Sequence, residues 1–232
     1  MKKFLVVIVL LLVAGYTIGQ KVSGGIIVSP VLSWMKPSIT KDIESEGVKF
    51  GVSFGIGGDF NLSDNFAFST GLLVNNFGGK LKYTDSIPAF TVDKGTSDSV
   101  YSFNPGAIID YKLQYIEIPF SLKGKTNEIG YMTYFMKAGI SPMFKYQAKG
   151  DVSQGNIDSE SIKKEVAGFA IGYNVGAGFE YSLGGNTKVL VELVYTKGLT
   201  DMTKTELYKS NGATGNEKVI LSNIALRLGI MF

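Results

Sequence analysis

Apolar and polar residues alternate along most of this chain, in runs that are long for a soluble domain. Such alternation gives a strand two chemically different faces. Each run exceeds the ~5–6 residues of an ordinary strand and reaches the ~9–11 residues that a tilted membrane strand needs. We therefore predict eight strands, at residues 21–35, 47–62, 66–83, 109–124, 131–147, 166–183, 187–199 and 218–232.

One face of each predicted strand is strongly apolar and the other carries glycine, serine and charge. In the second strand the apolar face consists of Val48, Phe50, Val52, Phe54, Ile56 and Phe60. In the last strand it consists of Ile220, Ile224, Leu226, Leu228, Ile230 and Phe232. A soluble barrel would turn these faces inward, as in a lipocalin-like ligand binder, whereas a membrane barrel turns them toward lipid. The lean opposite faces suit a narrow interior and favour the membrane interpretation.

The connections between the strands alternate strictly in length. Short turns are expected at residues 61–65, 123–130 and 183–186, and long polar loops at 36–46, 84–108, 148–165 and 200–217. In outer-membrane barrels the short turns are periplasmic and the long loops extracellular. The pattern predicts an all-β fold, an eight-stranded antiparallel up-and-down transmembrane β-barrel.

Both ends of the chain are consistent with export to a bacterial (Gram-negative) outer membrane. Lys2 and Lys3 precede an apolar run at residues 4–14, which is shorter than the ~20 residues of a spanning helix, and Thr17 and Gly19 supply a cleavage site. We expect a signal peptide at residues 1–19 and a barrel domain at 20–232; an uncleaved anchor is the alternative. Phe232, a terminal aromatic, resembles the signature read by the barrel-assembly machinery, a partner expected during biogenesis.

Composition narrows the function classes. The net charge of +3 falls to +1 without Lys2 and Lys3, so a nucleic-acid partner is not supported. The chain has no Cys and no His, which excludes disulfides, Ser-His or Cys-His catalysis and a His-bearing metal site. The acids of residues 151–160 do not match the spacing of a calcium loop. We predict no enzyme activity, no cofactor and no metal.

The inward faces of the predicted strands carry four acids and five bases. They are Lys49, Asp59, Glu117, Lys123, Lys137, Lys145, Glu180, Glu192 and Arg227. Lone charges in a narrow interior are costly, so we expect an internal network of ion pairs that plugs the barrel. The alternative is a narrow pore that is gated when the ion pairs rearrange. An eight-stranded barrel has no room for an open channel, so a general porin is not expected.

Several segments resemble the PorT-like family of small outer-membrane barrels, which are of the OmpA/OmpX eight-stranded type. The segments are Tyr115-Ile-Glu-Ile-Pro-Phe-Ser-Leu-Lys123, Phe135-Met-Lys-Ala-Gly-Ile-Ser-Pro-Met-Phe144, Gly176-Ala-Gly-Phe-Glu-Tyr181 and Val194-Tyr-Thr-Lys-Gly-Leu-Thr200. The resemblance implies a fold and a location, and it carries over no catalytic residue. A founding branch of the family is implicated in type IX protein secretion. Pro119 is expected near a bulge or a weakened pairing.

Three functions remain open at this point. The first is a structural or interaction barrel that sits in outer-membrane lipid and meets a protein partner at loops 84–108 and 200–217. The second is an accessory of a secretion machine. The third is the narrow gated pore. Long exposed loops favour the first, because binding residues concentrate on loops held by a rigid scaffold.

Overall fold

The computed structural model describes residues 22–38, 42–95, 97–155, 157–208 and 214–232. The predicted signal peptide therefore lies outside the described residues. Nearly everything described is β-strand, with one 3-10 turn, η1 (Lys163–Glu165). No helix in the described part of the chain has the length and hydrophobicity to span a bilayer.

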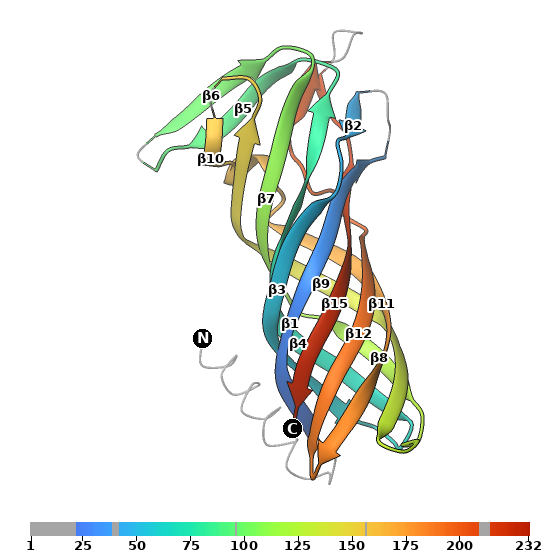
Figure 1. Ribbon diagram of the computed structural model, residues 1–232. Coiled ribbons are helices and arrows are strands. Elements are labelled where there is room, and N and C mark those ends of the chain that lie inside the picture. The colour runs from blue at the N-terminus through green and yellow to red at the C-terminus, as the bar shows by residue number, and fades with distance from the viewer. Residues whose placement is uncertain (1–21, 39–41, 96, 156, 209–213) are drawn as a thin grey trace, which may run out of the picture.

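Antiparallel pairing closes the sheet into a ring, in which every strand pairs with its neighbours along the chain and β15 pairs back with β1 (Figure 1). The ring consists of β1 (Val22–Pro37), β3 (Lys49–Asn61), β4 (Phe66–Tyr83), β7 (Ala107–Glu117) continued by β8 (Phe120–Lys125), β9 (Met132–Val152), β11 (Phe169–Gly184), β12 (Thr187–Gly198) and β15 (Val219–Met231). The predicted eight-stranded up-and-down barrel is confirmed.

The strand predicted at residues 109–124 is divided in two. The ladder is interrupted at Ile118 and Pro119, because proline has no N–H to donate. The pairing register with β4 continues unchanged across the gap, from Leu73 opposite Glu117 to Thr70 opposite Phe120. The break is thus a local loss of pairing at the predicted position, and the strand keeps its course through the barrel wall.

The four long connections lie where they were predicted, but most of their described residues form strands that were not predicted. They contain β2 (Ile43–Ser45), β5 (Ile87–Asp93), β6 (Asp98–Phe103), β10 (Ile157–Ser161), β13 (Glu206–Tyr208) and β14 (Thr214–Asn216). Together with η1 and the ends of β4, β7 and β9 beyond Asn76, Gln114 and Gln147, these strands form what we call the loop module. It stands at the end of the barrel opposite the C-terminus (Figure 1).

The outer surface of the barrel is apolar between two sets of aromatic side chains. One set lies near the short turns and includes the stacked rings of Phe68 and Phe120, with centroids 6.2 Å apart. The other lies toward the loop module and includes Trp34 and Tyr195, with centroids 6.4 Å apart. Aromatic girdles at both interfaces are typical of outer-membrane barrels. The predicted lipid-facing side chains are exposed, as expected: Phe50 is 67% exposed and Ile56 is 59% exposed.

The interior changes character along the barrel axis. Toward the short turns it is lined by buried charged and polar side chains, whereas toward and inside the loop module it is a continuous apolar core. Members of that core with less than 1% exposure include Met35, Leu81, Tyr83, Ile87, Phe90, Ile109 and Tyr111. The apolar core therefore closes the barrel from the loop side.

The short turns and the C-terminus border the other end, where a cavity of about 370 Å³ reaches Asp59 and Glu180. The turn between β11 and β12 places Gly184 and Gly185 at φ values of +114° and +61°, which favour glycine. Phe232 exchanges backbone hydrogen bonds with Gly24 of β1, at 2.7 and 3.1 Å. The last residue thus completes the seam, and its role as an assembly signature stays a prediction.

Candidate functional site

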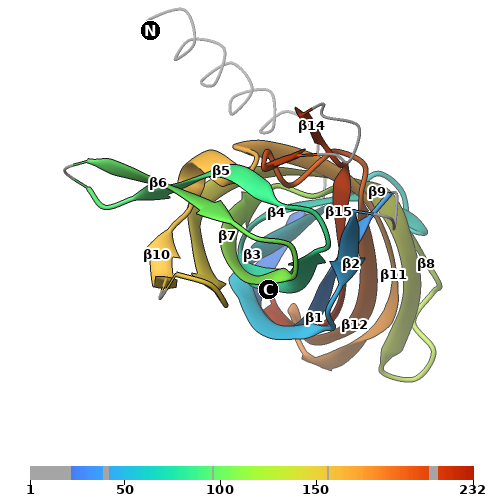
Figure 2. The same ribbon diagram turned by 90° about the horizontal axis from the view of Figure 1, so that it is seen from above.

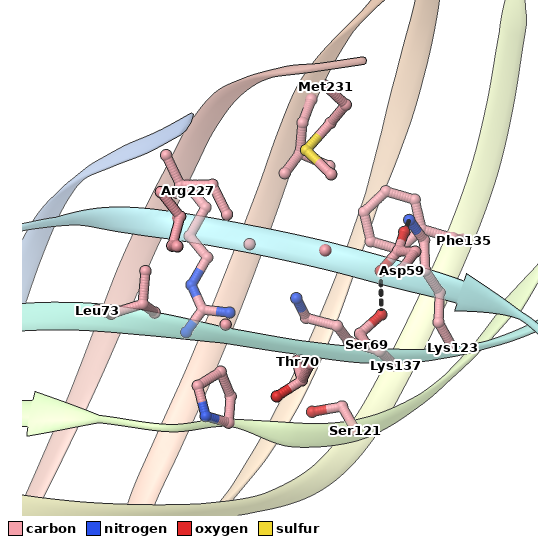
Figure 3. A pocket seen from close by; sticks show the side chains of 17 residues that line it. Asp59, Ser69, Thr70, Leu73, Ser121, Lys123, Phe135, Lys137, Arg227 and Met231 are labelled. Carbon is pink, nitrogen blue, oxygen red and sulfur yellow. Dashed lines mark hydrogen bonds and ion pairs between the residues drawn. The ribbon is translucent and has the colours of Figure 1, made fainter. Parts of the chain in front are cut away.

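The lumen contains two acidic side chains on strands that lie opposite each other in the ring, four strand positions apart. Asp59 of β3 and Glu180 of β11 both face inward, and Lys123 of β8 lies between them. Figure 3 shows Lys123 next to Asp59. The Lys123 ammonium is 2.6 Å from Asp59 Oδ2 and also bonds Glu180 Oε1. Ser69 donates to Asp59 Oδ1 at 2.5 Å, and Lys188 lies 3.1 Å from Glu180 Oε2. We call this group the lower cluster.

A second group, the upper cluster, lies closer to the loop module. Lys137 of β9 is 2.7 Å from Glu192 Oε2 of β12. The Arg227 guanidinium of β15 lies between two acids, 3.6 Å from Glu117 and 3.9 Å from Glu192. The longer distances show that Arg227 stabilises both carboxylates mainly through charge and holds neither in a tight bidentate bond.

Neutral polar side chains complete the upper cluster. Glu117 accepts hydrogen bonds from Asn75 Nδ2 at 2.5 Å and from Ser141 Oγ at 2.7 Å. Asn174 donates to Ser141 at 2.9 Å and accepts from Ser121 at 2.8 Å. Five strands are thereby connected through one buried network, which fixes their register because buried polar groups need their partners.

Apolar side chains fill the space between the clusters. Phe135 is 4% exposed, and the Lys123 ammonium lies 4.1 Å from the centroid of its ring. Ile27, Leu73, Leu190 and Met231 surround Phe135. The cavity that remains has a volume of about 30 Å³, which is the space of about one water molecule.

Seven of the nine predicted lumenal residues lie in these two clusters. Asp59, Lys123 and Glu180 belong to the lower cluster, and Glu117, Lys137, Glu192 and Arg227 to the upper cluster. Lys49 and Lys145 do not reach either of them.

Lys49 lies on the outer side of the wall. Behind it β1 and β4 approach each other directly, with Ser33 Oγ 2.9 Å from the carbonyl oxygen of Gly78. The Lys49 side chain therefore crosses the outside of β4 and bonds Asp110, as well as the carbonyl oxygen of Tyr111 at 3.2 Å. The prediction from strand parity was wrong here because β3 begins where it has already separated from β4.

Lys145 lies next to a bulge, where the β7–β9 register shifts between Gln114 and Tyr115. Its ammonium donates to the carbonyl oxygen of Val166 at 2.6 Å and to that of Lys163. Lys145 thus binds the η1 turn and is absent from the lumenal network. The register shift falls after Lys145, so its parity is unchanged; it leaves the network because it lies beyond Ser141 and Met143 toward the loop module, where the η1 turn supplies its acceptors.

Sequence reasoning also missed several members of the network. Lys188, Ser69, Asn75, Ser141 and Asn174 all lie at inward positions of predicted strands. Their parity was available from the sequence, but their partners depend on the stagger between strands. Phe135 shares the parity of Thr133 and Lys137, but only charged residues were selected as lumenal candidates.

The lumen is balanced in charge. Four acids (Asp59, Glu117, Glu180, Glu192) face four bases (Lys123, Lys137, Lys188, Arg227). Among the described residues, no group of three acidic side chains is placed to hold a metal ion. Breaking one of these buried pairs leaves a charge without its partner, whereas the intact set stabilises one register of the strands. The geometry supports a structural network.

Comparison with known proteins identifies the family. A family model described as an outer membrane protein beta-barrel domain matches residues 17–204. Among curated proteins, none matches the sequence. The narrower PorT-like resemblance stays a prediction.

Solved structures with a related architecture share little sequence with this chain. OprG from Pseudomonas aeruginosa is 14% identical, with 92% of this chain and 98% of that chain covered and a TM-score of 0.43. Neisserial surface protein A is 14% identical, with 90% and 99% covered and a TM-score of 0.42. Ail of Yersinia pestis, in complex with sucrose octasulfate, is 12% identical, with 91% and 99% covered and a TM-score of 0.41. Because the family model spans most of the chain and the strands close into a barrel, the chain belongs to the outer membrane β-barrel family and is an integral protein of the Gram-negative outer membrane.

Proposed function

We propose that this protein is a non-enzymatic interaction barrel, whose loop module binds an extended segment of a partner protein by strand addition along β6. The observation that carries the proposal is the open edge of the main sheet. The strand order ends β9-β10-β5-β6, so β6 pairs with β5 on one side and with no other described strand on the other. An unpaired edge is a template for a strand from another chain.

The position of this edge makes it accessible. The β5–β6 hairpin projects sideways from the loop module, away from the barrel axis (Figure 2). Val100 in the middle of β6 is 64% exposed. The strand contains no proline and no lysine, the residues that commonly protect an exposed edge against pairing.

The hairpin is held firmly on its inner side. Phe90 and Phe103 are buried against each other, with ring centroids 5.6 Å apart. The carboxylate of Glu165 accepts hydrogen bonds from the Thr91 N–H at 2.8 Å and from Thr205 Oγ1 at 2.9 Å, which joins β5 to η1 and to the segment before β13. A preorganised edge loses little freedom on binding, which favours affinity.

The second predicted contact region, residues 200–217, supports the module from within. Met202 and Leu207 are 1% and 0% exposed and belong to the apolar core. The described part of this region thus packs beneath the hairpin, and we assign the contact to β6.

The other two functions have less support. A gated pore conflicts with a lumenal cavity of about 30 Å³ and with the apolar core above it. It predicts discrete conductance that changes when Glu117 or Arg227 is neutralised. The secretion role rests on the PorT-like resemblance alone and predicts that deletion of the protein abolishes export of other proteins.

Proline substitution tests the edge. Successive N–H groups of a strand point to opposite sides. Of the two substitutions Val100→Pro and Tyr101→Pro, one therefore removes a hydrogen bond between β5 and β6. The other, which we call the outward variant, removes only an N–H group that points to the open edge. The outward variant should keep the hairpin folded. A photo-crosslinker at Ser99 in living cells should give one discrete protein adduct. The outward variant should abolish this adduct, and a crosslinker at the control position Lys197 should not give it. The same adduct in both proline variants, or none at Ser99, would contradict the proposal.

A further inference from the structure

Three lysines lie in a row across the outer face of the sheet, where the loop module joins the barrel. Lys112 of β7 and Lys149 of β9 are directly opposite each other in the antiparallel register, and Lys112 is opposite Gly78 of β4 on its other side. Lys49 reaches over Gly78, where a Cβ would lie 3.3 Å from Lys49 Cδ. The row therefore runs Lys49, Lys112, Lys149 over neighbouring strands.

This arrangement leaves positive charge without an internal counterpart. Like charges directly opposite in a sheet are destabilising. Lys112 is 2.6 Å from Asp151, and Lys49 bonds Asp110, whereas no hydrogen bond or ion pair holds the Lys149 ammonium among the described residues. With Lys80, which lies 4.0 Å from Asp110, four lysines face two aspartates. These four lysines and two aspartates together carry a net charge of +2.

The row borders a groove, which we call the interface groove. It has a volume of about 280 Å³, and its lining includes the three lysines of the row, Phe50, Gln114 and Gln147. Amide side chains lie next to the lysines: Gln114 Nε2 donates to Asn76 Oδ1 at 2.7 Å, and Gln147 lies opposite Gln114. Lysine ammonium and amide N–H groups are donors suited to phosphate oxygens.

The groove lies at the edge of the lipid-facing band. Phe50 lines it and is 67% exposed, and outward side chains on the barrel side of the groove are apolar, including Val52 at 40% and Phe144 at 47% exposure. On the other side the outward side chains are charged, beginning with Lys80 and Asp110. The groove is therefore at the height of lipid headgroups in the leaflet on the loop side.

We infer that the interface groove binds the phosphate group of an outer-leaflet glycolipid. The lysine row supplies the charge and the amides supply further donors, while Phe50 and the apolar band below offer a surface for an acyl chain. A free phosphate would use only the upper half of this site. Occupation by a phosphate also relieves the repulsion between Lys112 and Lys149, so the lipid should stabilise this junction.

Lipid titration of the full-length protein in detergent, followed by native mass spectrometry, tests the inference. The probes are bis-phosphorylated lipid A, dephosphorylated lipid A and inorganic phosphate. The double variant Lys112→Gln/Lys149→Gln should bind bis-phosphorylated lipid A about tenfold more weakly or worse, because each basic residue near an anionic headgroup contributes several-fold. A heat-modifiable gel band establishes that the variant is folded.

The matched control is Lys36→Gln/Lys197→Gln. These two exposed lysines lie one outward position beyond Trp34 and Tyr195, at the same edge of the apolar band, and neither is opposite another lysine. The affinity of the control for bis-phosphorylated lipid A should lie within twofold of the wild-type affinity. The wild type should bind bis-phosphorylated lipid A more tightly than dephosphorylated lipid A. Equal loss in both double variants would overturn the inference, because the effect would then be general charge. Competition by inorganic phosphate at the lipid's own concentration would also overturn it, because the site would then hold a free anion.

Discussion

The barrel and the loop module share strands β4, β7 and β9, but the polarity of the buried and the outward face is reversed between the two regions. Within β7, Glu117 is buried in the lumen and Ile116 faces lipid, whereas Tyr111 and Ile109 are buried in the module and Lys112 faces outward. The strand keeps its alternation throughout. What changes is the surroundings of each face, at the row formed by Asn76, Gln114 and Gln147.

The comparison shows that the chemistry of a strand face follows the medium it meets. In the membrane the solvent is apolar, so the large apolar side chains lie outside and the charges must find partners within. Above the membrane the solvent is water, so burial of apolar area drives the same strands to form a core. A single chain thus has a charged interior in the membrane and an apolar interior above it, and β4, β7 and β9 pass through both.

The largest expected effect comes from the lumen. Lys123→Met leaves the Asp59 and Glu180 carboxylates buried without their common cation, which should lower the free energy of unfolding by about 3–5 kcal/mol. Urea titration of the refolded barrel, read by the heat-modifiable gel band, measures this. Lys82→Met is the control, since its pair with Glu44 at 3.3 Å is exposed and should be worth about 0–1 kcal/mol. Similar losses in both would contradict the role given to the lower cluster.

The module core should respond locally. Leu81 is fully buried, and Leu81→Ala should cost about 2–5 kcal/mol through lost contacts and a cavity. Hydrogen exchange should show faster opening of β5, β6 and β10 while the barrel strands stay protected. Lys80→Ala, on the exposed face one residue earlier, should change little. Faster exchange throughout the barrel strands would mean that the two regions do not unfold separately.

A charge on the lipid face should cost more near the bilayer centre than at the interface. Leu72 of β4 is 46% exposed to lipid, and Leu72→Arg should destabilise the barrel by about 2–4 kcal/mol near the bilayer centre. Leu199→Arg, at an outward position two residues beyond Lys197, lies at the edge of the apolar band and is 48% exposed, and it should cost about 0–1 kcal/mol. Denaturant titration in liposomes compares the two. Equal costs would mean that the lipid band extends into the module.

The smallest effect at neutral pH, and the most selective one, concerns a tyrosine pair in the module. The hydroxyls of Tyr83 and Tyr111 are 2.6 Å apart. Burial, together with the neighbouring Tyr111, raises the pKa of Tyr83, and burial raises the pKa of Tyr111. Their contribution to stability is therefore complete below the unfolded pKa of about 10 and is lost as pH rises from there toward the folded pKa.

We expect the module to open in strong alkali before the barrel does. Tyrosinate absorbance should show a late, cooperative ionisation step that coincides with loss of hydrogen-exchange protection in β5. Tyr83→Phe/Tyr111→Phe should remove this pair's share of that step and leave the heat-modifiable band in place; the share of Tyr115, which is also buried, should remain. Ionisation of every tyrosine in one simple step near pH 10 would contradict the burial of this pair.

The sequence was most informative where alternation is unbroken. The predicted bounds of residues 66–83 coincide with β4, and the inward positions of Asp59, Glu180 and Arg227 follow from parity alone. The loop strands escaped prediction because their alternation is interrupted. Between β5 and β6 the register shifts between Ile87 and Phe90, so the buried side chains do not keep a period of two.

The partners within the lumen were beyond the sequence for a different reason. Parity places Lys137 and Glu192 inside the barrel, but these residues lie on β9 and β12, which do not pair with each other. Which inward side chains meet depends on the stagger and tilt of the strands. A single sequence does not specify these, so a list of inward charges does not by itself give their pairing.

The strands β4, β7 and β9 run from the lipid band into the loop module without a linker. In mechanical terms, these continuous strands couple the module rigidly to the barrel, so the module cannot rotate independently of it. A force applied to the β5–β6 hairpin would therefore be transmitted to the barrel and would act as a torque on it within the bilayer. The hairpin is thus held at a set height and heading above the cell surface, and a ligand has to approach it from the side.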